Sequence, residues 1–290
     1  MLELTSPSLR LVVRPEIGAS VARFDWMDGA EARPLLRPWD GRSDDPNAHA
    51  CYPLVPWSNR ISGGGIEAGG RFWPLRANWP GAPYPIHGEG WQQAWQVERR
   101  TAAEVVLALE SDGQPPFDYR ARLTYALADD ALTMRLAVEH RGAVAVPYGL
   151  GFHPWLPRTP DTRLELAASE VWLETAAHLP AGKVPIGDRP DWDFARERPL
   201  PDTWINNGLS GWAGTARVRW PERGLRLTVT ASPVLDTCIL YSPARDATFF
   251  CLEPVSHPVD AFHLPGMPGL RWLRTGERLE IACSFAVAAC

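Results

Sequence analysis

Apolar and polar residues alternate with a period of two along several segments of the chain. In Leu132–His140, LTMRLAVEH, every second residue from Leu132 to Val138 is apolar, and Leu225–Ala231, LRLTVTA, repeats the pattern. Because successive side chains of a strand point to opposite faces, these segments are predicted to be strands with one buried face. Further strands are predicted at Ser8–Val13, Val21–Trp26, Glu104–Leu109, Arg120–Ala126, Arg163–Leu166, Val171–Glu174, Ala216–Trp220, Thr237–Tyr241, Thr248–Leu252 and Arg278–Val287.

Pro and Gly divide the chain into short segments, and no long capped helical pattern occurs. Many short strands separated by turn signals predict an all-β fold, a large antiparallel β-sandwich. Two Pro-rich zones, Pro38–Gly90 and Leu179–Gly211, are predicted to be long irregular loops, which usually carry function in a compact domain. No linker interrupts the pattern, so residues 1–290 are expected to form one domain.

The charge balance argues against nucleic acid as a partner. The net charge is −5, the pI is about 5.8 and no basic stripe occurs, whereas binding to phosphates needs a basic patch. The N-terminus lacks a basic segment followed by an apolar core, and no apolar run is long enough to span a bilayer, so no membrane partner is expected. Five widely spaced cysteines favour free thiols and a cytoplasmic protein.

Polar side chains gather at four places within apolar surroundings. The segments are PWSNRISGGG (56–65), PIHGEGW (85–91), GLGFHPWL (149–156) and FFCLEPVSHPVDAFH (249–263). In the last of these, Glu253 ends an apolar run, where a buried carboxylate is costly unless it has a partner or a role. By contrast, His49, His140 and His178 are interpreted as structural histidines with satisfied hydrogen bonds.

Metal binding is one alternative for the fourth segment. Glu253 and His257 are four residues apart, a spacing that converges on one ion in a helix, and His263 follows. Pro254 and Pro258 exclude such a helix, so a zinc site would need ligands from different strands. A glycosidase is a second alternative, because Glu253 with Glu89 or Asp260 would supply two carboxylates.

One carboxylate paired with one imidazole is the third alternative. A glutamate serves as general base and a histidine as general acid near neutral pH. The pair suits the opening of a sugar hemiacetal, in which the anomeric hydroxyl loses a proton and the ring oxygen gains one. That reaction needs no metal, nucleotide or covalent intermediate.

Taken together, the four segments resemble the aldose 1-epimerase family, the galactose mutarotase-like proteins. The motifs NRISGG (59–64), HGEGW (87–91), GFHPW (151–155) and LEPVSHPVDAF (252–262) occur in the order found in the family and cover nearly the whole chain. The last motif is similar to a bacterial subgroup whose sugars are often unassigned. The resemblance implies the galactose mutarotase-like supersandwich fold and a cofactor-independent, metal-free isomerase that interconverts the α and β anomers of a free aldose.

The resemblance also implies a role for each matching residue. Arg60 is expected to contact sugar hydroxyls, and His87 to bind or polarise the sugar ring. His153 is expected to be the general acid on the ring oxygen, and Glu253 the general base on the anomeric hydroxyl. Asn59, which precedes Arg60 in the same motif, is expected to bind the sugar as well.

One position departs from the pattern of the subgroup. The segment NNGLSGW (206–212) has Asn206 where the subgroup carries an aspartate that binds sugar hydroxyls. Asn206 is therefore expected to bind the sugar without a charge-assisted hydrogen bond, and Asp202 is the alternative. Tryptophans stack on the apolar faces of sugars, and the chain has 14 of them. Trp155 is expected in the site. Of the motif-flanking set, one or two are expected to line the site: Trp57, Trp91, Trp155 and Trp212.

Two further functions stay open. A hexose-6-phosphate 1-epimerase would use extra cations, and Arg60, Arg71 and Arg76 all lie in the first Pro-rich zone. A non-catalytic sugar-binding protein would keep the same scaffold without the chemistry. In each case the expected partner is a small-molecule sugar, and the chain is expected to be a monomer or homodimer.

Overall fold

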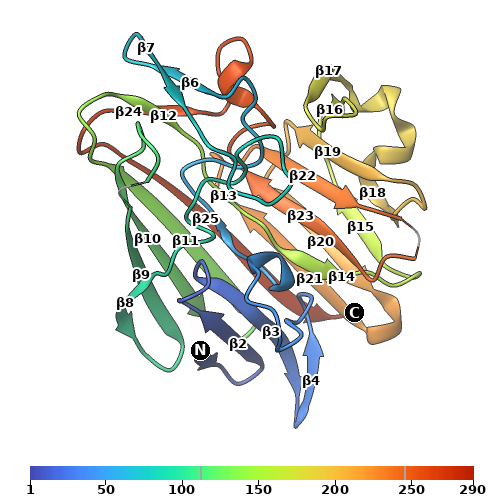
Figure 1. The fold of residues 1–290 in the computed structure, drawn as a ribbon. Helices are drawn as coiled ribbons and strands as arrows, with labels where there is room; N and C mark the ends of the chain where they lie inside the picture. The colour runs from blue at the N-terminus through green and yellow to red at the C-terminus, as the bar shows by residue number, and fades with distance from the viewer. Residues whose placement is uncertain (112, 245) are drawn as a thin grey trace.

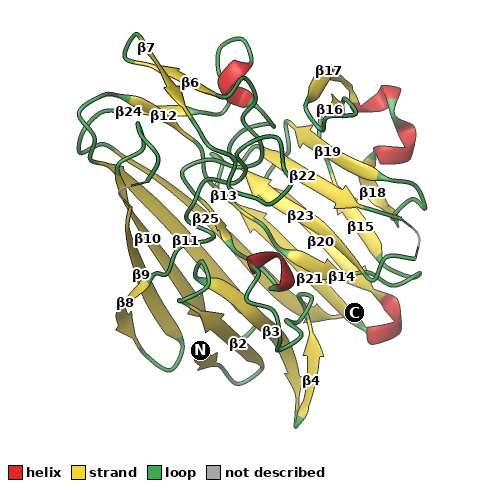
Figure 2. Ribbon diagram, in the orientation of Figure 1, coloured by secondary structure: helices red, strands yellow, loops and turns green. Residues whose placement is uncertain are grey.

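The computed structural model describes residues 1–111, 113–244 and 246–290 (Figure 1). These residues form the predicted all-β fold, in which the strands of two large sheets pair antiparallel. The helical segments among them are short 3-10 turns (Figure 2), namely η1 (Pro46–Ala48), η2 (Ile186–Asp188), η3 (Pro190–Trp192), η4 (Pro221–Arg223) and η5 (Ala261–His263). None of the helices in the described ranges is long and apolar enough to cross a membrane.

The first large sheet has nine strands in the order β18-β15-β20-β21-β25-β11-β10-β9-β8. Its strands are β8 (Gln96–Arg100), β9 (Glu104–Ser111), β10 (Tyr119–Leu127), β11 (Ala131–His140), β15 (Arg163–Leu166), β18 (Phe194–Pro199), β20 (Thr215–Trp220), β21 (Leu225–Ala231) and β25 (Arg278–Ala289). Burial alternates along β10 and β11, so that Leu123 and Leu136 pair on the buried face while Arg122 and Arg135 are exposed. The sequence pattern thus predicted seven of the nine strands of this sheet, and it missed β8 and β18.

The second large sheet has the order β17-β16-β19-β22-β23-β13-β5, with β14 also paired to β23. Its strands are β5 (Pro53–Leu54), β13 (Gly151–Phe152), β14 (Trp155–Pro157), β16 (Glu170–Glu174), β17 (Pro180–Pro185), β19 (Ile205–Ser210), β22 (Thr237–Ser242) and β23 (Phe249–Val255). This sheet contains Glu253 and Asn206, and His153 lies between β13 and β14. It therefore carries most of the polar residues that the sequence singles out.

Smaller sheets complete the fold. The N-terminal sheet, in the order β1-β2-β3-β4, consists of β1 (Leu2–Thr5), β2 (Leu9–Arg14), β3 (Ser20–Asp28) and β4 (Glu31–Pro34). The two-stranded sheets are β6 (Gly65–Ala68) with β7 (Arg71–Pro74), and β12 (Val146–Tyr148) with β24 (Arg271–Leu273). Figure 1 shows β6, β7, β12 and β24 at one end of the molecule, and β2, β3 and β4 at the other.

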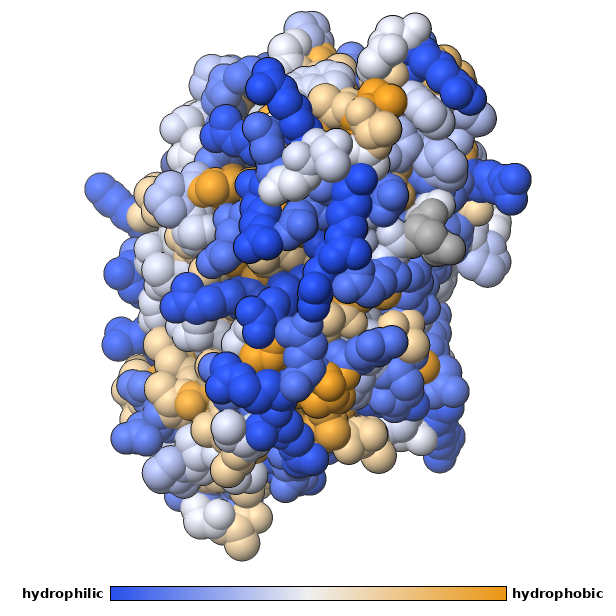
Figure 3. Space-filling model, turned by 90° about the vertical axis from the view of Figure 1, so that its left-hand side faces the viewer, coloured by the Kyte–Doolittle hydropathy of each residue, from blue (hydrophilic) through white to orange (hydrophobic). Residues whose placement is uncertain are grey.

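Most of the buried apolar side chains of the two large sheets lie in one cluster. Leu136 and Ile281 of the first sheet and Leu240 and Leu252 of the second belong to it. In β23, the residues on either side of Leu252 point away from this cluster, because side chains alternate along a strand. Figure 3 views the molecule from the left-hand side of Figure 1, and this face is mainly hydrophilic with apolar residues scattered in small groups.

The second Pro-rich zone is not the irregular loop that was predicted. It contains β17, β18 and β19. β17 and β18 are the terminal strands of the two large sheets, and proline is tolerated at an edge because its missing N–H breaks no ladder bond. The first zone contains η1 and the short strands β5, β6 and β7, and much of the rest of it is irregular, as expected.

The cysteines are free thiols, as the sequence indicated. Four of them, Cys51, Cys238, Cys251 and Cys283, are buried, and Cys290 is exposed.

The pairing of Leu123, Leu136 and Ile281 across β10, β11 and β25 gives a stability prediction. Leu136 is fully buried, so Leu136→Ala should lower the free energy of unfolding by about 2–5 kcal/mol through lost burial and the cavity left behind. Arg135→Ala, on the exposed face of the same strand, should change it by less than about 0.5 kcal/mol. Urea denaturation midpoints of the two variants test this, and equal shifts would contradict the assigned faces.

Candidate active site

All seven residues predicted to form the site line one pocket on the second large sheet. The pocket has a volume of about 350 Å³, at the lower end of the range for small-molecule sites. The predicted residues are Asn59, Arg60, His87, His153, Trp155, Asn206 and Glu253, and the lining also includes Asn47, Trp79, Ala82, Ile86, Trp91, His178, Trp204 and Tyr241. Residues far apart in the sequence therefore converge where the motifs indicated.

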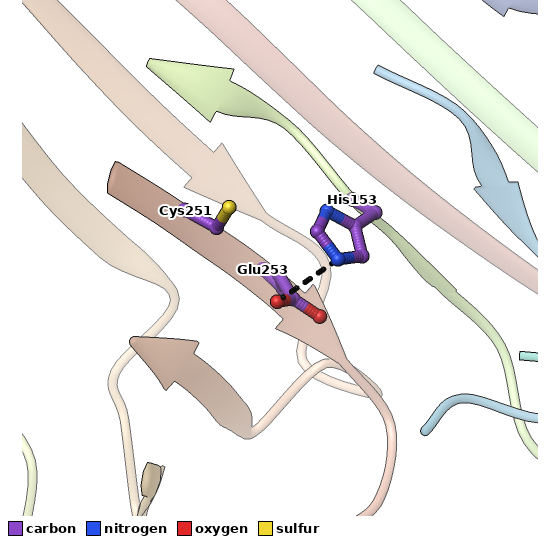
Figure 4. A group of neighbouring side chains, drawn as sticks. All are labelled: His153, Cys251 and Glu253. Carbon is purple, nitrogen blue, oxygen red and sulfur yellow. Dashed lines mark ion pairs between the residues drawn. The ribbon is translucent and has the colours of Figure 1, made fainter. Parts of the chain in front are cut away.

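Strand β23 positions Glu253. Phe250 and Leu252 point into the main core, so Glu253 points to the opposite face, toward the pocket. Its Oε1 lies 3.3 Å from Nε2 of His153 (Figure 4), and its Oε2 is buried without a hydrogen-bond partner in the described chain. Burial raises the pKa of Glu253 to about 8, although the nearby Arg60 opposes that rise.

His153 is held from both sides by aromatic rings. Its backbone N–H donates to the carbonyl of Tyr52, and its ring centroid lies 4.7 Å from that of Tyr52 and 5.1 Å from that of Trp155. Burial, together with a smaller effect of the charge of Arg37, lowers the pKa of His153 to about 3. The neutral forms of both Glu253 and His153 are thus favoured, so at neutral pH the pair holds one acidic proton.

The loops that carry Asn59 and His87 hold each other by two hydrogen bonds. The backbone N–H of Asn59 donates to Nδ1 of His87 at 3.0 Å, and the backbone N–H of His87 donates to the carbonyl of Asn59 at 2.9 Å. Because Nδ1 accepts, Nε2 of His87 carries the hydrogen and is a donor. Burial holds the pKa of His87 well below its usual value, which keeps the ring neutral.

The same two residues adopt a strained backbone. Asn59 has φ of 56° and His87 has φ of 62°, in the left-handed region that side-chain-bearing residues rarely adopt. The next residue, Gly88, has φ of 67°, and a Cβ there would lie 2.2 Å from the carbonyl oxygen of Val55. Glycine is therefore required for the HG motif to pack against the loop that carries Asn59.

Arg60 is the one Arg or Lys among the described residues that line the pocket. Its Nη1 donates to Oδ1 of Asn59 at 3.0 Å. Burial lowers its pKa, and the carboxylate of Glu174 opposes this effect, as does Glu253 when it is ionised. The guanidinium is thus available to a ligand in the pocket.

The structure distinguishes Asn206 from Asp202. Asn206 lines the pocket, and its Nδ2 donates to Oε2 of Glu174 at 2.9 Å. Asp202 lies elsewhere, with Oδ1 3.9 Å from Nη2 of Arg158, in a separate cavity. Of the motif-flanking tryptophans, Trp91 and Trp155 line the pocket, whereas Trp57 and Trp212 belong to the core.

The sequence did not indicate Glu174, His178 or Trp204. His178 is not a purely structural histidine, because it lines the pocket and its Nδ1 bonds to Oε2 of Glu174 at 2.8 Å. Nε1 of Trp204 donates to Oε1 of the same carboxylate at 2.7 Å. The available signal was the position of Trp204 in a Pro-rich zone, and it was too weak without the sheet pairing that joins β16 to β19.

The metal-ligand set suggested by the sequence does not form among the described residues. Nε2 of His257 accepts the backbone N–H of Ser58, and Nδ1 of His263 bonds to Asp260. The described residues instead bring together His153, Cys251 and Glu253, whose ligand atoms lie within 4.8 Å of one another (Figure 4). These three side chains are the ones that could hold a metal ion.

The second carboxylate of a glycosidase does not lie in the lining either. Glu89 accepts hydrogen bonds from Ser111 and Gln114, and Asp260 from the backbone and hydroxyl of Ser62. Of the described residues that line the pocket, Glu253 is the carboxylate. The pair of Glu253 and His153 is what this pocket offers for proton transfer.

Comparison with known proteins identifies the family of this chain. The family model for aldose 1-epimerase matches residues 1–286. The chain belongs to the aldose 1-epimerase family. The chain is 35% identical to the uncharacterized protein YphB of Escherichia coli K12 over 290 residues, which cover 98% of this chain and 97% of YphB.

Two solved structures share the fold. A candidate aldose 1-epimerase from Escherichia coli K12 superposes with a TM-score of 0.91 at 33% identity, covering 99% of this chain and 98% of that one. A galactose mutarotase-like protein from Clostridium acetobutylicum gives a TM-score of 0.87 at 15% identity, with coverage of 99% and 95%. The predicted galactose mutarotase-like fold is confirmed, and family and fold together support a sugar epimerase of the mutarotase type.

The buried Glu253 carboxyl gives a prediction for stability against pH. Because its pKa of about 8 in the folded protein lies above its ordinary value, the stability gained from the bound proton is lost as pH rises through 8. Wild type should therefore lose about 2 kcal/mol relative to Glu253→Gln between pH 6.5 and 8.5. Denaturation curves of both proteins across this range provide the measurement, and parallel pH profiles would show that Glu253 is not protonated in the fold.

Proposed function

We propose that this protein interconverts the α and β anomers of a free aldose by acid–base opening and reclosure of the sugar ring. The single observation that carries the proposal is the contact of 3.3 Å between a buried carboxyl and a buried imidazole. Both groups line a pocket of monosaccharide scale, and Oε2 of Glu253 is left without a partner in the described chain. An unsatisfied buried oxygen in a pocket fits a hydroxyl donor from a ligand.

Ring opening moves two protons. Glu253 takes the proton of the anomeric hydroxyl, and His153 gives a proton to the ring oxygen as the C1–O bond breaks. The open aldehyde then rotates about the C1–C2 bond. For reclosure on the other face, His153 takes the proton back and Glu253 returns one to O1, so the pair ends in its starting state.

The starting state needs the proton on His153, whereas the empty pocket favours it on Glu253. Sugar binding supplies the free energy needed to move the proton from Glu253 to His153. The anomeric hydroxyl donates to Glu253 and stabilises the carboxylate, while the ring oxygen accepts from His153 and stabilises the imidazolium. Because the two groups are in contact, the proton passes between them within the pair, and no exchange with solvent is needed.

The remaining lining residues suit a neutral, hydroxyl-rich ligand. Nε2–H of His87 and the guanidinium of Arg60 are donors, while Asn206 offers an amide oxygen as acceptor. Trp79 and Trp91 stack on each other at 5.5 Å, and with Trp155 they provide flat apolar walls for the C–H faces of a sugar. Neither proton transfer requires a metal or an organic cofactor, so we propose cofactor-independent catalysis.

Replacing the proposed base should abolish most of the rate enhancement. Glu253→Gln should slow mutarotation by about 10²- to 10⁴-fold after subtraction of the spontaneous reaction, because an amide cannot take the proton. Glu170→Gln, in a strand of the same sheet but outside the pocket lining, is the matched control and should keep the wild-type rate. Polarimetry over a panel of free aldoses measures both. A wild type that binds sugar without accelerating mutarotation would favour the non-catalytic alternative.

A metal requirement is tested separately. Treatment with a chelator should leave the mutarotation rate unchanged. Cys251→Ser, which removes the thiol from the group of possible ligands found among the described residues, should do the same. Loss of activity in both experiments, restored by added zinc in the wild type alone, would overturn cofactor independence.

A further inference from the structure

Glu174, at the end of β16, is a carboxylate at the border of the pocket with three hydrogen-bond donors. Its Oε2 accepts from Nδ2 of Asn206 at 2.9 Å and bonds to Nδ1 of His178 at 2.8 Å, and its Oε1 accepts from Nε1 of Trp204 at 2.7 Å. Asn206, His178 and Trp204 all line the main pocket. One carboxylate therefore fixes three side chains of the pocket wall.

A small recess beside the main pocket contains Glu174. The two hollows share Asn59, Arg60, His178 and Asn206. Nδ2 of Asn206 donates to Glu174, whereas Oδ1 of Asn206 makes no hydrogen bond within the described chain. The amide is thereby oriented to accept from a hydroxyl rather than to donate to an anion.

Glu174 also sets the charge of the pocket. Arg60 lies within electrostatic reach of both Glu174 and Glu253. Arg60 and Glu174 line the same recess, so the carboxylate of Glu174 compensates the charge of the guanidinium. A phosphate or carboxylate on the sugar would therefore gain little attraction from Arg60 and would be repelled by Glu174.

We propose that Glu174 is a specificity-determining residue that restricts this pocket to uncharged sugars. It cancels the charge of Arg60 for an incoming anion and presents Asn206 to hydroxyls as an acceptor. The inference rests on the proposed function for the identity of the ligand as a sugar. No other arginine of the described residues lines the pocket. Arg71 stacks on Trp73, and Arg37 stacks on Trp155.

The test compares a neutral ligand with its phosphorylated form. Unreactive 1,5-anhydro sugars and their 6-phosphates, which lack the anomeric hydroxyl, are titrated into the protein by calorimetry. Wild type should bind the neutral ligand more tightly. Glu174→Gln should shift the affinity ratio toward the phosphate by roughly tenfold, and the shift should shrink in high salt because it is electrostatic. Glu174→Asp, which keeps the charge, should retain the wild-type preference.

The control for surface charge is Glu170→Gln. Glu170 lies at the start of the same strand, is paired with Lys183, and does not line the pocket, so its loss should leave the affinity ratio unchanged. An unchanged ratio in Glu174→Gln, or an equal shift in Glu170→Gln, would overturn the role of Glu174. Because calorimetry needs no turnover, its outcome is independent of mutarotation activity. Binding without catalysis would contradict only the proposed function. Catalysis by the wild type, together with an unchanged affinity ratio in Glu174→Gln, would contradict only this inference.

Discussion

Glu253 and His153 face each other with almost no exposure to solvent. The free-energy cost of a buried charge at this contact is the constraint on which the rest of the pocket depends. Each group by itself is driven to its neutral form by burial, in opposite pKa directions. Their contact lets one proton serve both, so the site keeps an acid and a base without a buried net charge. The strand β23 makes this possible, because its alternation sends Phe250 and Leu252 into the core and Glu253 toward the pocket.

The walls of the pocket keep water away from Glu253 and His153. A row of rings runs from Trp79 through Trp91 and Tyr52 to His153 and Trp155, each stacked or tilted against the next. The loops with Asn59 and His87 close another side, and their left-handed backbones persist because two mutual hydrogen bonds hold them. Rigid strands and mutually locked loops place donors and acceptors before a ligand arrives, which lowers the cost of orienting it.

The residues that sequence could identify were those in distinctive local patterns. Glu253 ended an apolar run before a proline, and His153 lay in a short motif between aromatic and proline residues, so both were found and both line the pocket. Glu174 and Trp204 could not be found in this way, because they meet only through antiparallel pairing between strands about 30 residues apart. For the same reason Asp202 looked equivalent to Asn206, although strand pairing directs only Asn206 into the pocket. The edge strands β17 and β18 were missed because proline content was taken as a loop signal without knowledge of sheet position.

The location of the acidic proton is the central claim, since the proposed chemistry depends on a pair that shares one. Infrared difference spectroscopy of wild type against Glu253→Gln, at neutral pH, reports the carboxyl group directly. We expect the band of a protonated carboxyl in the empty protein and its conversion to carboxylate when a free aldose binds. A carboxylate band already present without sugar, and unchanged by it, would contradict the account.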